Sequence, residues 1–214
     1  GEDVTPLELR FGPREGLLAM RYRRADGGAS VQLLHETVLR RVMHGEWALI
    51  QESASAVQLV HAGGASFTIE VAMRIVGCAI HKDTLVLWSG SQVVLFQFDL
   101  AGRGDVAEIG SFDSPARAAA LWGESLYLCV DDRIEKCNFQ GAVLSTMALK
   151  EQEGRPTCVH ASGLGKSAYL VVGTDCGYVK AWDVTRREAR QLAPSRRMVE
   201  GAASRVVVAQ ISCD

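Results

Sequence analysis

The sequence predicts an all-β protein, and three observations carry this prediction. Short apolar runs of four to eight residues recur along the chain and are rich in Val, Leu, Ile and aromatic side chains. Turn-forming pairs such as Ser89-Gly90 and Asp131-Asp132 separate these runs. No long segment shows the apolar period of about 3.6 residues that is typical of an amphipathic helix.

The predicted strands are short and follow one another closely. The clearest cover residues 17–23, 48–53, 56–61, 84–88, 92–98, 125–130, 133–139, 168–173 and 178–184. Each combines β-branched or aromatic residues with flanking turn residues. The segment 185–192 fits either a single helical turn or an outer strand.

A repeat underlies this pattern. Four seventeen-residue segments align without gaps and begin at Trp47, Asp83, Glu124 and Ser167, which are 36, 41 and 43 residues apart. Their third position is always apolar, with Leu49, Leu85, Leu126 and Tyr169. Each segment therefore reads as a strand, a tight turn and a second strand.

Further strands complete each repeat. Apolar segments precede the repeats at 38–43, 75–80, 116–121 and 157–161, and looser ones follow at 66–71 and 142–149. Four strands in a unit of about forty residues are typical of a β-propeller blade. One such sheet cannot bury both of its faces alone, so neighbouring sheets stack around an axis.

The predicted organisation is part of one propeller over residues 1–214. It has about four to five blades of a ring of about seven. The expected blades are 14–35 (partial), 38–71, 75–112, 116–150 and 157–193, with 204–214 as the first strand of the next blade. An open arc exposes apolar faces and strand edges, so we expect the rest of the ring outside this sequence or on another chain.

The last repeat carries a more specific motif. It places the small pair Gly173-Thr174 before Asp175 and Gly177, and it ends in Trp182-Asp183. This hairpin resembles the centre of a WD40 repeat. Phe98-Asp99 occupies the Trp-Asp position of the second repeat, whereas the usual Gly-His dipeptide occurs in none of them. The Asp–His–Ser/Thr–Trp hydrogen-bond network of WD40 blades is therefore not expected, and other contacts must hold these blades together.

A narrower resemblance extends over much of the chain. The runs 170–190, 81–96 and 33–39 are similar to the large subunits of intraflagellar transport complex A, most closely the one-hundred-and-forty-kilodalton subunit. Its sharpest part is Arg186-Arg187-Glu188-Ala189. The resemblance implies a non-catalytic scaffold for retrograde ciliary transport and ciliary membrane-protein entry. It also implies other complex A subunits as partners, and a location in the cytoplasm, the cilium or flagellum, and its base.

Composition narrows the alternatives. The formal net charge is −2, and the basic residues are dispersed, so neither nucleic-acid binding nor direct membrane insertion is expected. None of the six cysteines stands in a Cys-x-x-Cys pair, so we expect no metal, no cofactor and no disulfide framework. The remaining alternatives are an adaptor of a membrane coat or a ubiquitin ligase, and a propeller enzyme.

Several local patterns resemble binding or catalytic motifs. The run 163–167 (GLGKS) resembles a phosphate-binding loop, but a strand follows it instead of the helix that phosphate binding needs. Cys158 and His160 lie two residues apart on one strand, without a positioning acid, and indicate a packed face. No catalytic residue is therefore predicted, and Trp47 is expected at the rim.

Partner docking is predicted at exposed arginines. The candidates are Arg186, Arg187, Arg196 and Arg197, because arginine is enriched at energetically important positions of protein interfaces.

Overall fold

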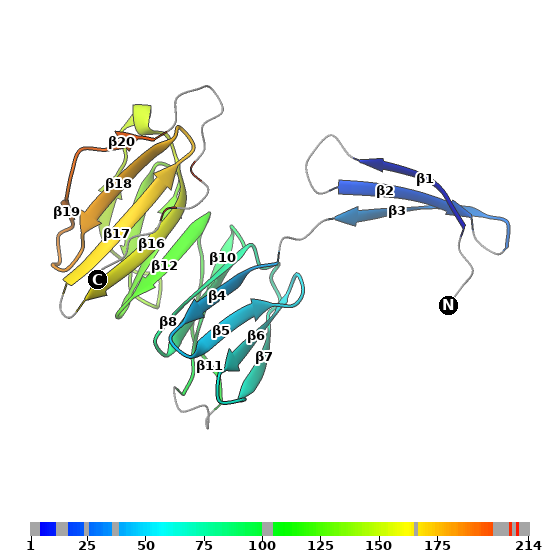
Figure 1. Ribbon diagram of the computed structural model, residues 1–214, viewed down its shortest axis with the longest axis horizontal. Coiled ribbons are helices and arrows are strands. Elements are labelled where there is room, and N and C mark those ends of the chain that lie inside the picture. Colours follow the sequence, from blue (N-terminus) through cyan, green and yellow to red (C-terminus); the bar gives the residue numbers. More distant parts are fainter. Residues whose placement is uncertain are drawn as a thin grey trace. The chain divides into compact units, whose positions relative to one another are not determined.

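The computed structural model describes residues 5–11, 17–23, 26–35, 39–99, 105–164, 167–198, 206 and 209 (Figure 1). This part of the chain is almost entirely β, with one 3-10 turn, η1 (Glu151–Glu153). None of its helices is long and apolar enough to cross a bilayer. The chain divides into two compact units, Gly1–Leu39 and Arg40–Asp214.

The first unit is a three-stranded antiparallel sheet. It consists of β1 (Thr5–Phe11), β2 (Leu17–Arg23) and β3 (Ala29–His35), in that order. Sequence reasoning did not predict β1, whose apolar Leu7 and Leu9 alternate with charged Glu8 and Arg10. That the sheet belongs to the same ring as the second unit stays a prediction.

The described strands of the second unit form four sheets. The first comprises β4 (Arg41–His44), β5 (Trp47–Gln51), β6 (Ala56–His61) and β7 (Ser66–Glu70). The second comprises β8 (Gly77–His81), β9 (Thr84–Trp88), β10 (Gln92–Gln97) and β11 (Ala107–Asp113). The third comprises β12 (Ala118–Trp122), β13 (Ser125–Val130), β14 (Arg133–Cys137) and β15 (Val143–Ala148). Within each sheet, consecutive strands pair antiparallel in chain order.

The fourth sheet has an irregular outer edge. Its strands β16 (Pro156–Leu164), β17 (Ser167–Thr174) and β18 (Tyr178–Asp183) are regular. Two short strands, β19 (Arg190–Gln191) and β20 (Arg196–Arg197), pair with opposite ends of β18. Between them, residues 192–195 leave the ladder, so the outermost strand is split in two.

The sheets stack as in a propeller. The first strands of successive sheets are neighbours, with β4 beside β8, β8 beside β12, and β12 beside β16. Three apolar clusters fill the spaces between the sheets. The prediction of an all-β propeller fragment is confirmed. The segment 204–214, where a further strand is predicted, lies outside the described residues except for Val206 and Ala209, which are not in a strand.

Strand β9 shows why the apolar runs are continuous. All five of its residues are buried. Leu85 and Leu87 pack toward the first sheet, whereas Val86 and Trp88 pack toward the third. Side chains of a strand alternate between its faces, and here both faces are covered. The run TLVLW therefore lacks the polar alternation of a half-exposed strand.

Gly110 permits one of the closest approaches between sheets. It lies in β11, and a Cβ atom at this position would collide with the backbone carbonyl oxygen of Phe139 in the third sheet. Backbone moves much less readily than a flexible side chain. We therefore predict that Gly110→Ala lowers the free energy of unfolding by about 1 to 3 kcal/mol in urea titrations.

The neighbouring exposed Ser111 supplies the control. Ser111→Ala is expected to change the free energy of unfolding by no more than about 0.5 kcal/mol. Equal stabilities of the two variants would contradict the close packing of β11 on the third sheet.

Candidate protein interaction surface

The hairpin between β17 and β18 contains the WD40-like motif. Gly173 and Thr174 end β17, and Gly177 adopts a φ of 79°, a left-handed conformation that favours glycine. The Thr174 hydroxyl accepts a hydrogen bond from the backbone N–H of Tyr178 (3.1 Å). Asp175 accepts one from the N–H of Arg155 (2.7 Å), which joins the hairpin to the connector before β16.

Trp182 and Asp183 end β18 in different environments. The Trp182 side chain is only 4% exposed and packs in the cluster between the third and fourth sheets. The Asp183 carboxylate accepts a hydrogen bond from the backbone N–H of Thr185 (2.9 Å). Hydrogen bonds from the Thr185 side chain and backbone lower the pKa of Asp183, as do the charges of Arg186 and Arg190.

The second sheet has Phe98 at the Trp-Asp position, followed by the exposed Asp99. Phe98 is 4% exposed and meets Trp47 of the first sheet edge to face, with ring centroids 4.8 Å apart. The expectation that Trp47 lies at the rim is wrong, since this side chain is 3% exposed. Its strand position gives no hint of the aromatic partners His61 and Phe98, which come from later strands.

A buried ion pair secures the fourth sheet. Lys180 of β18 and Glu153 of η1 are 5% and 1% exposed, and Lys180 Nζ lies 3.0 Å from Glu153 Oε2. The same carboxylate oxygen accepts the backbone N–H of Lys150 (2.7 Å). Sequence reasoning missed this pair because 27 residues separate its members and exposed charge is the usual state of Lys and Glu.

The carboxyl group of this pair is held in its charged form. Burial alone raises the pKa of Glu153. Hydrogen bonds from Ser195 and from the Lys150 N–H, together with the ammonium of Lys180, outweigh burial, so the pKa lies below its ordinary value. Lys180 Nζ also lies 5.3 Å from the centroid of the Trp182 ring. The ion pair thus connects the motif tryptophan to the connector from the third sheet.

Single buried polar groups join the other sheets. Gln51 is 1% exposed, and its amide donates to the carbonyl oxygens of Ser53 (2.9 Å) and Ile75 (3.2 Å), the latter at the start of the second sheet. The indole N–H of Trp88 donates to the carbonyl oxygen of Arg117, just before β12 (3.3 Å). These contacts join neighbouring sheets, as we expected of blades whose sequences do not predict the WD40 hydrogen-bond network.

Three rings stack at the ends of the inner strands. His81 lies between His44 and Trp122, with ring centroids 4.7 Å apart on each side. His81 is 7% exposed, and its Nε2 atom has no hydrogen-bond partner in the described part of the chain. Burial, reinforced by the nearby His44 and Lys82 and opposed by Asp83, lowers the pKa of His81 to about 4.

Two sequence patterns suggested chemistry, the 163–167 run and the pair Cys158 and His160, and the structure describes part of the first and all of the second. In the 163–167 run, β16 ends at Leu164 and β17 begins at Ser167, so a strand follows the run; Gly165 and Lys166 lie outside the described residues. Cys158 and His160 both lie on β16, and the Cys158 thiol faces the Val206 carbonyl oxygen (3.7 Å). The described residues contain no cluster of three His, Cys, Asp or Glu able to hold a metal ion.

The described cysteines are all free thiols. Burial raises the pKa of Cys78 and of Cys137 to about 11, and raises that of Cys129 as well. Such thiols stay protonated near neutral pH and are poor nucleophiles.

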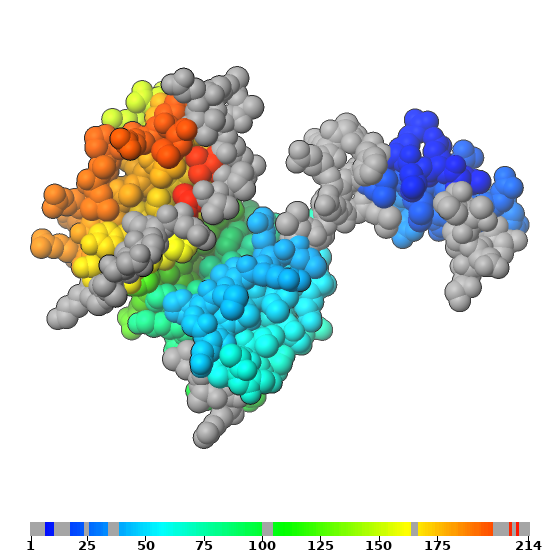
Figure 2. Space-filling model, viewed as in Figure 1, coloured from blue at the N-terminus to red at the C-terminus, as the bar shows by residue number. Residues whose placement is uncertain are grey.

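The four arginines predicted to dock partners lie on the irregular outer edge of the fourth sheet. Arg186 and Arg187 follow β18, and Arg196 and Arg197 form β20; all four are exposed. Segment 185–198, here called the basic edge, holds these four, Arg190 and a single acid, Glu188. It lies on the surface of the second unit, orange in Figure 2.

The other outer edges carry different charge. Segment 99–113 contains four acids (Asp99, Asp105, Glu108 and Asp113) and one basic residue, Arg103. The outer segment of the third sheet, 138–149, has no charged residue, and that of the first, 62–70, has only Glu70. The outer edges of the four sheets therefore differ in charge, and charge is not spread evenly over the surface.

Comparison with known proteins places the chain among propellers. Residues 45–214 match the model of the family described as the IFT140 second beta-propeller. BBS1N, solved in complex with ARL6DN, is similar over 94% of this chain and 69% of its own length, with a TM-score of 0.55 and 11% identity. KlHsv2 with loop 6CD replaced by a Gly-Ser linker has the same coverage, with a TM-score of 0.54 and 9% identity. Hsv2 of Kluyveromyces lactis is similar over 88% of this chain and 64% of its own length, with a TM-score of 0.50 and 8% identity.

We predict strong energetic coupling between Glu153 and Lys180. Glu153→Gln leaves a buried ammonium without its counter-charge, and Lys180→Met leaves a buried carboxylate. Each is expected to lower the free energy of unfolding by about 3 kcal/mol. The double variant Glu153→Gln with Lys180→Met removes both charges and should lose clearly less than the two single losses combined. Additive losses in urea titrations would show that the pair contributes no mutual stabilisation.

We also predict acid sensitivity from His81. Because its pKa is lowered in the folded protein, the unfolded chain binds the proton more readily below about pH 6.5. The free energy of unfolding should fall by about 1 to 2 kcal/mol between pH 7.5 and pH 5 from this group. His81→Phe keeps a ring between His44 and Trp122 and should reduce the loss. An unchanged acid-induced loss in this variant would assign the sensitivity to other groups.

Proposed function

Because the chain belongs to the family of the second β-propeller of IFT140, we propose that it is a protein-interaction scaffold of intraflagellar transport complex A. The family match over residues 45–214 carries this proposal. The packing is consistent with it, since sheets joined by three apolar clusters make a rigid platform for exposed loops and edges. The chain acts without chemistry of its own.

The scaffold serves retrograde ciliary transport and the entry of membrane proteins into cilia. Its partners are other subunits of the same complex, and it works in the cytoplasm, at the base of the cilium and within it. Support comes from the family match; the similarity to solved propellers at 8 to 11% identity concerns the fold alone.

Two groups of residues have separate roles in this proposal. Gly173, Thr174, Asp175, Gly177, Trp182, Asp183, Phe98 and Asp99 shape and pack the hairpins. Arg186, Arg187, Arg196 and Arg197 contact a partner, which their exposure supports.

The test is affinity purification from ciliated cells. The protein that contains this chain is tagged and expressed in cells that lack their own copy. We expect recovery of identified complex A subunits and restored return of cargo from the ciliary tip. Recovery of membrane-coat or ubiquitin-ligase subunits without complex A subunits would overturn the proposal.

A control variant separates the propeller's role from that of other domains. Leu126 is fully buried between the second and third sheets, so Leu126→Asp places a charge in that core. This variant is expected to lose partner recovery and cargo return, whereas Ser111→Ala keeps both. Full activity of Leu126→Asp would show that the propeller is dispensable.

A further inference from the structure

We infer that the basic edge binds an acidic, extended segment of a partner protein. The inference rests on the proposed scaffold function and names the chemistry of one partner. It begins from charge: five exposed arginines stand within 185–198 against one glutamate, in a chain whose formal net charge is −2. Among the described residues, none of the five is in an ion pair within 4.0 Å. The charges of Arg186 and Arg190 lower the pKa of Asp183 without an ion pair of this length, so their guanidinium groups can still bind carboxylates of a partner.

The backbone of the basic edge fits an extended ligand. Strands β19 and β20 pair with β18 on one side, and they are the outermost strands of the sheet. Each is two residues long, in contrast to five to seven residues for β7, β11 and β15, so a bound segment can form only a few backbone hydrogen bonds and depends mainly on the arginine side chains. Unpaired backbone groups at a sheet edge are the usual docking place for an added strand.

Hydrogen bonds and ring contacts hold the basic edge against β18 and η1. Leu192 N–H donates to the Ala181 carbonyl oxygen (3.0 Å), and Met198 N–H donates to that of Gly177 (2.8 Å). The Arg197 guanidinium lies over the Tyr178 ring, 6.0 Å from its centroid. Ser195 hydrogen bonds to Glu153 of the buried ion pair. Binding here therefore orders fewer groups than binding to a free loop.

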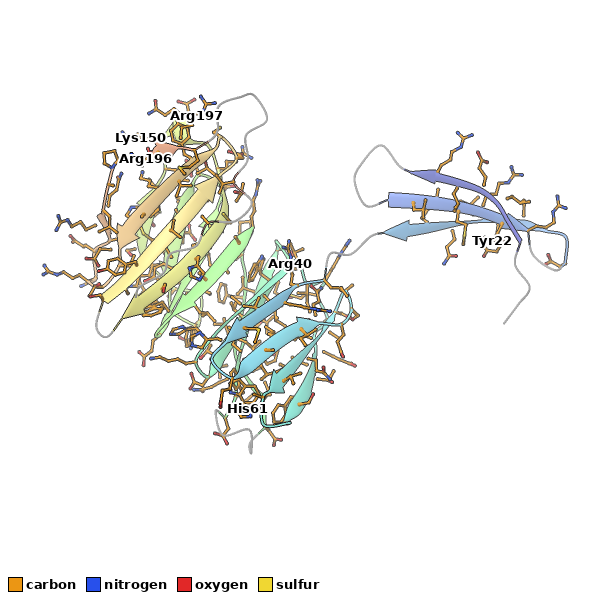
Figure 3. All side chains as sticks on the ribbon, in the orientation of Figure 1. Tyr22, Arg40, His61, Lys150, Arg196 and Arg197 are labelled. Atoms are coloured by element: carbon orange, nitrogen blue, oxygen red, sulfur yellow. The ribbon has the colours of Figure 1, made fainter. Side chains whose placement is uncertain are left out.

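A hollow beneath the split strand adds side-chain contacts. Lys150, Glu153 and residues 191–195 line it, and its volume is about 390 Å³. Figure 3 labels Lys150, Arg196 and Arg197 at this end of the sheet. Leu192 and Met198 are 48% and 62% exposed, and they offer apolar contact between the positive charges. Alternating acidic and apolar residues in an extended segment match this combination.

A protein partner fits better than a nucleic acid. Exposed aromatic side chains for base stacking are absent from segment 185–198. The four acids at the outer edge of the second sheet repel a long polyanion that extends over the unit. A short acidic segment confined to the basic edge avoids this repulsion.

The direct test is fluorescence anisotropy with the purified full chain. The probe is a labelled peptide of about twelve residues that alternates Glu with Val, and its control has Gln in place of Glu. We expect binding of the acidic peptide only, with a Kd that rises as sodium chloride increases from about 50 to about 300 mM. Equal binding of both peptides, or no binding of either, would overturn the inference.

Matched variants locate the binding surface. Arg196→Gln with Arg197→Gln should raise the Kd at least about fivefold, and adding Arg186→Gln, Arg187→Gln and Arg190→Gln should abolish binding. Arg40→Gln with Arg41→Gln removes two exposed arginines from the first sheet and should leave the Kd unchanged. All these side chains are exposed, so the variants are expected to melt as the unchanged protein does. An effect of equal size in both pairs would indicate only a general response to charge.

Two further outcomes separate this inference from its premise. A single-stranded RNA of equal charge that binds as tightly as the peptide would overturn a protein-specific edge. In ciliated cells, the five-arginine variant should lose one identified subunit while it retains the others. If it retains all of them, the inference about the edge fails and the scaffold function stands. If the unchanged protein recovers no complex A subunit, the scaffold function fails whatever the peptide result.

Discussion

The structure of the second unit depends on one constraint, which is that its two middle sheets have two apolar faces. Leu85 and Leu87 point from β9 toward one neighbour, and Val86 and Trp88 point toward the other. A single four-stranded sheet with this pattern cannot be stable in water, because one face would always be exposed. Stacking covers the apolar faces of a sheet with those of its neighbours. The order of the blades is therefore set by packing and not by chemistry at a single site. Close approach of backbones, as at Gly110 and the Phe139 carbonyl, follows from the same demand for dense packing.

Apolar stacking alone does not specify how neighbouring sheets are aligned. Buried polar contacts supply this directional information, and each joins one sheet to the segment that leads into or out of the next. Gln51 reaches Ile75, Trp88 reaches Arg117, and Lys180 reaches Glu153 of the connector. These contacts differ in chemistry from blade to blade, in contrast to the repeated network of a regular WD40 propeller. Where the WD40 motif has diverged, a different buried polar contact therefore stabilises each interface between sheets.

The surface follows a different rule from the core. Interior positions recur with the repeat, whereas charge differs from edge to edge, with acids at the outer edge of the second sheet and arginines at that of the fourth. A platform of similar blades with unlike edges can hold several partners in defined places. This arrangement is consistent with the family of the IFT140 second propeller, to which the chain belongs. The split strand of the fourth sheet is the clearest departure from the repeat, and it lies where positive charge is concentrated.

The sequence by itself determined the fold class, the approximate position of most strands, the four repeats and the family, because these features depend on local composition and on spacing along the chain. The continuous apolar runs indicated strands, and the Trp182-Asp183 hairpin indicated a WD40 propeller. The runs 170–190, 81–96 and 33–39 indicated the narrower family. Only the tertiary structure decided which side chains meet. It joined Lys180 to Glu153, placed Trp47 against Phe98, and stacked His81 between His44 and Trp122. It also showed β1, which sequence reasoning missed although its alternation of apolar and charged residues is typical of a half-exposed strand. It split the outer strand in the segment that fitted either a helical turn or a strand. The physical reason is that such contacts join residues far apart in the chain, so their energies appear only once the sheets have stacked.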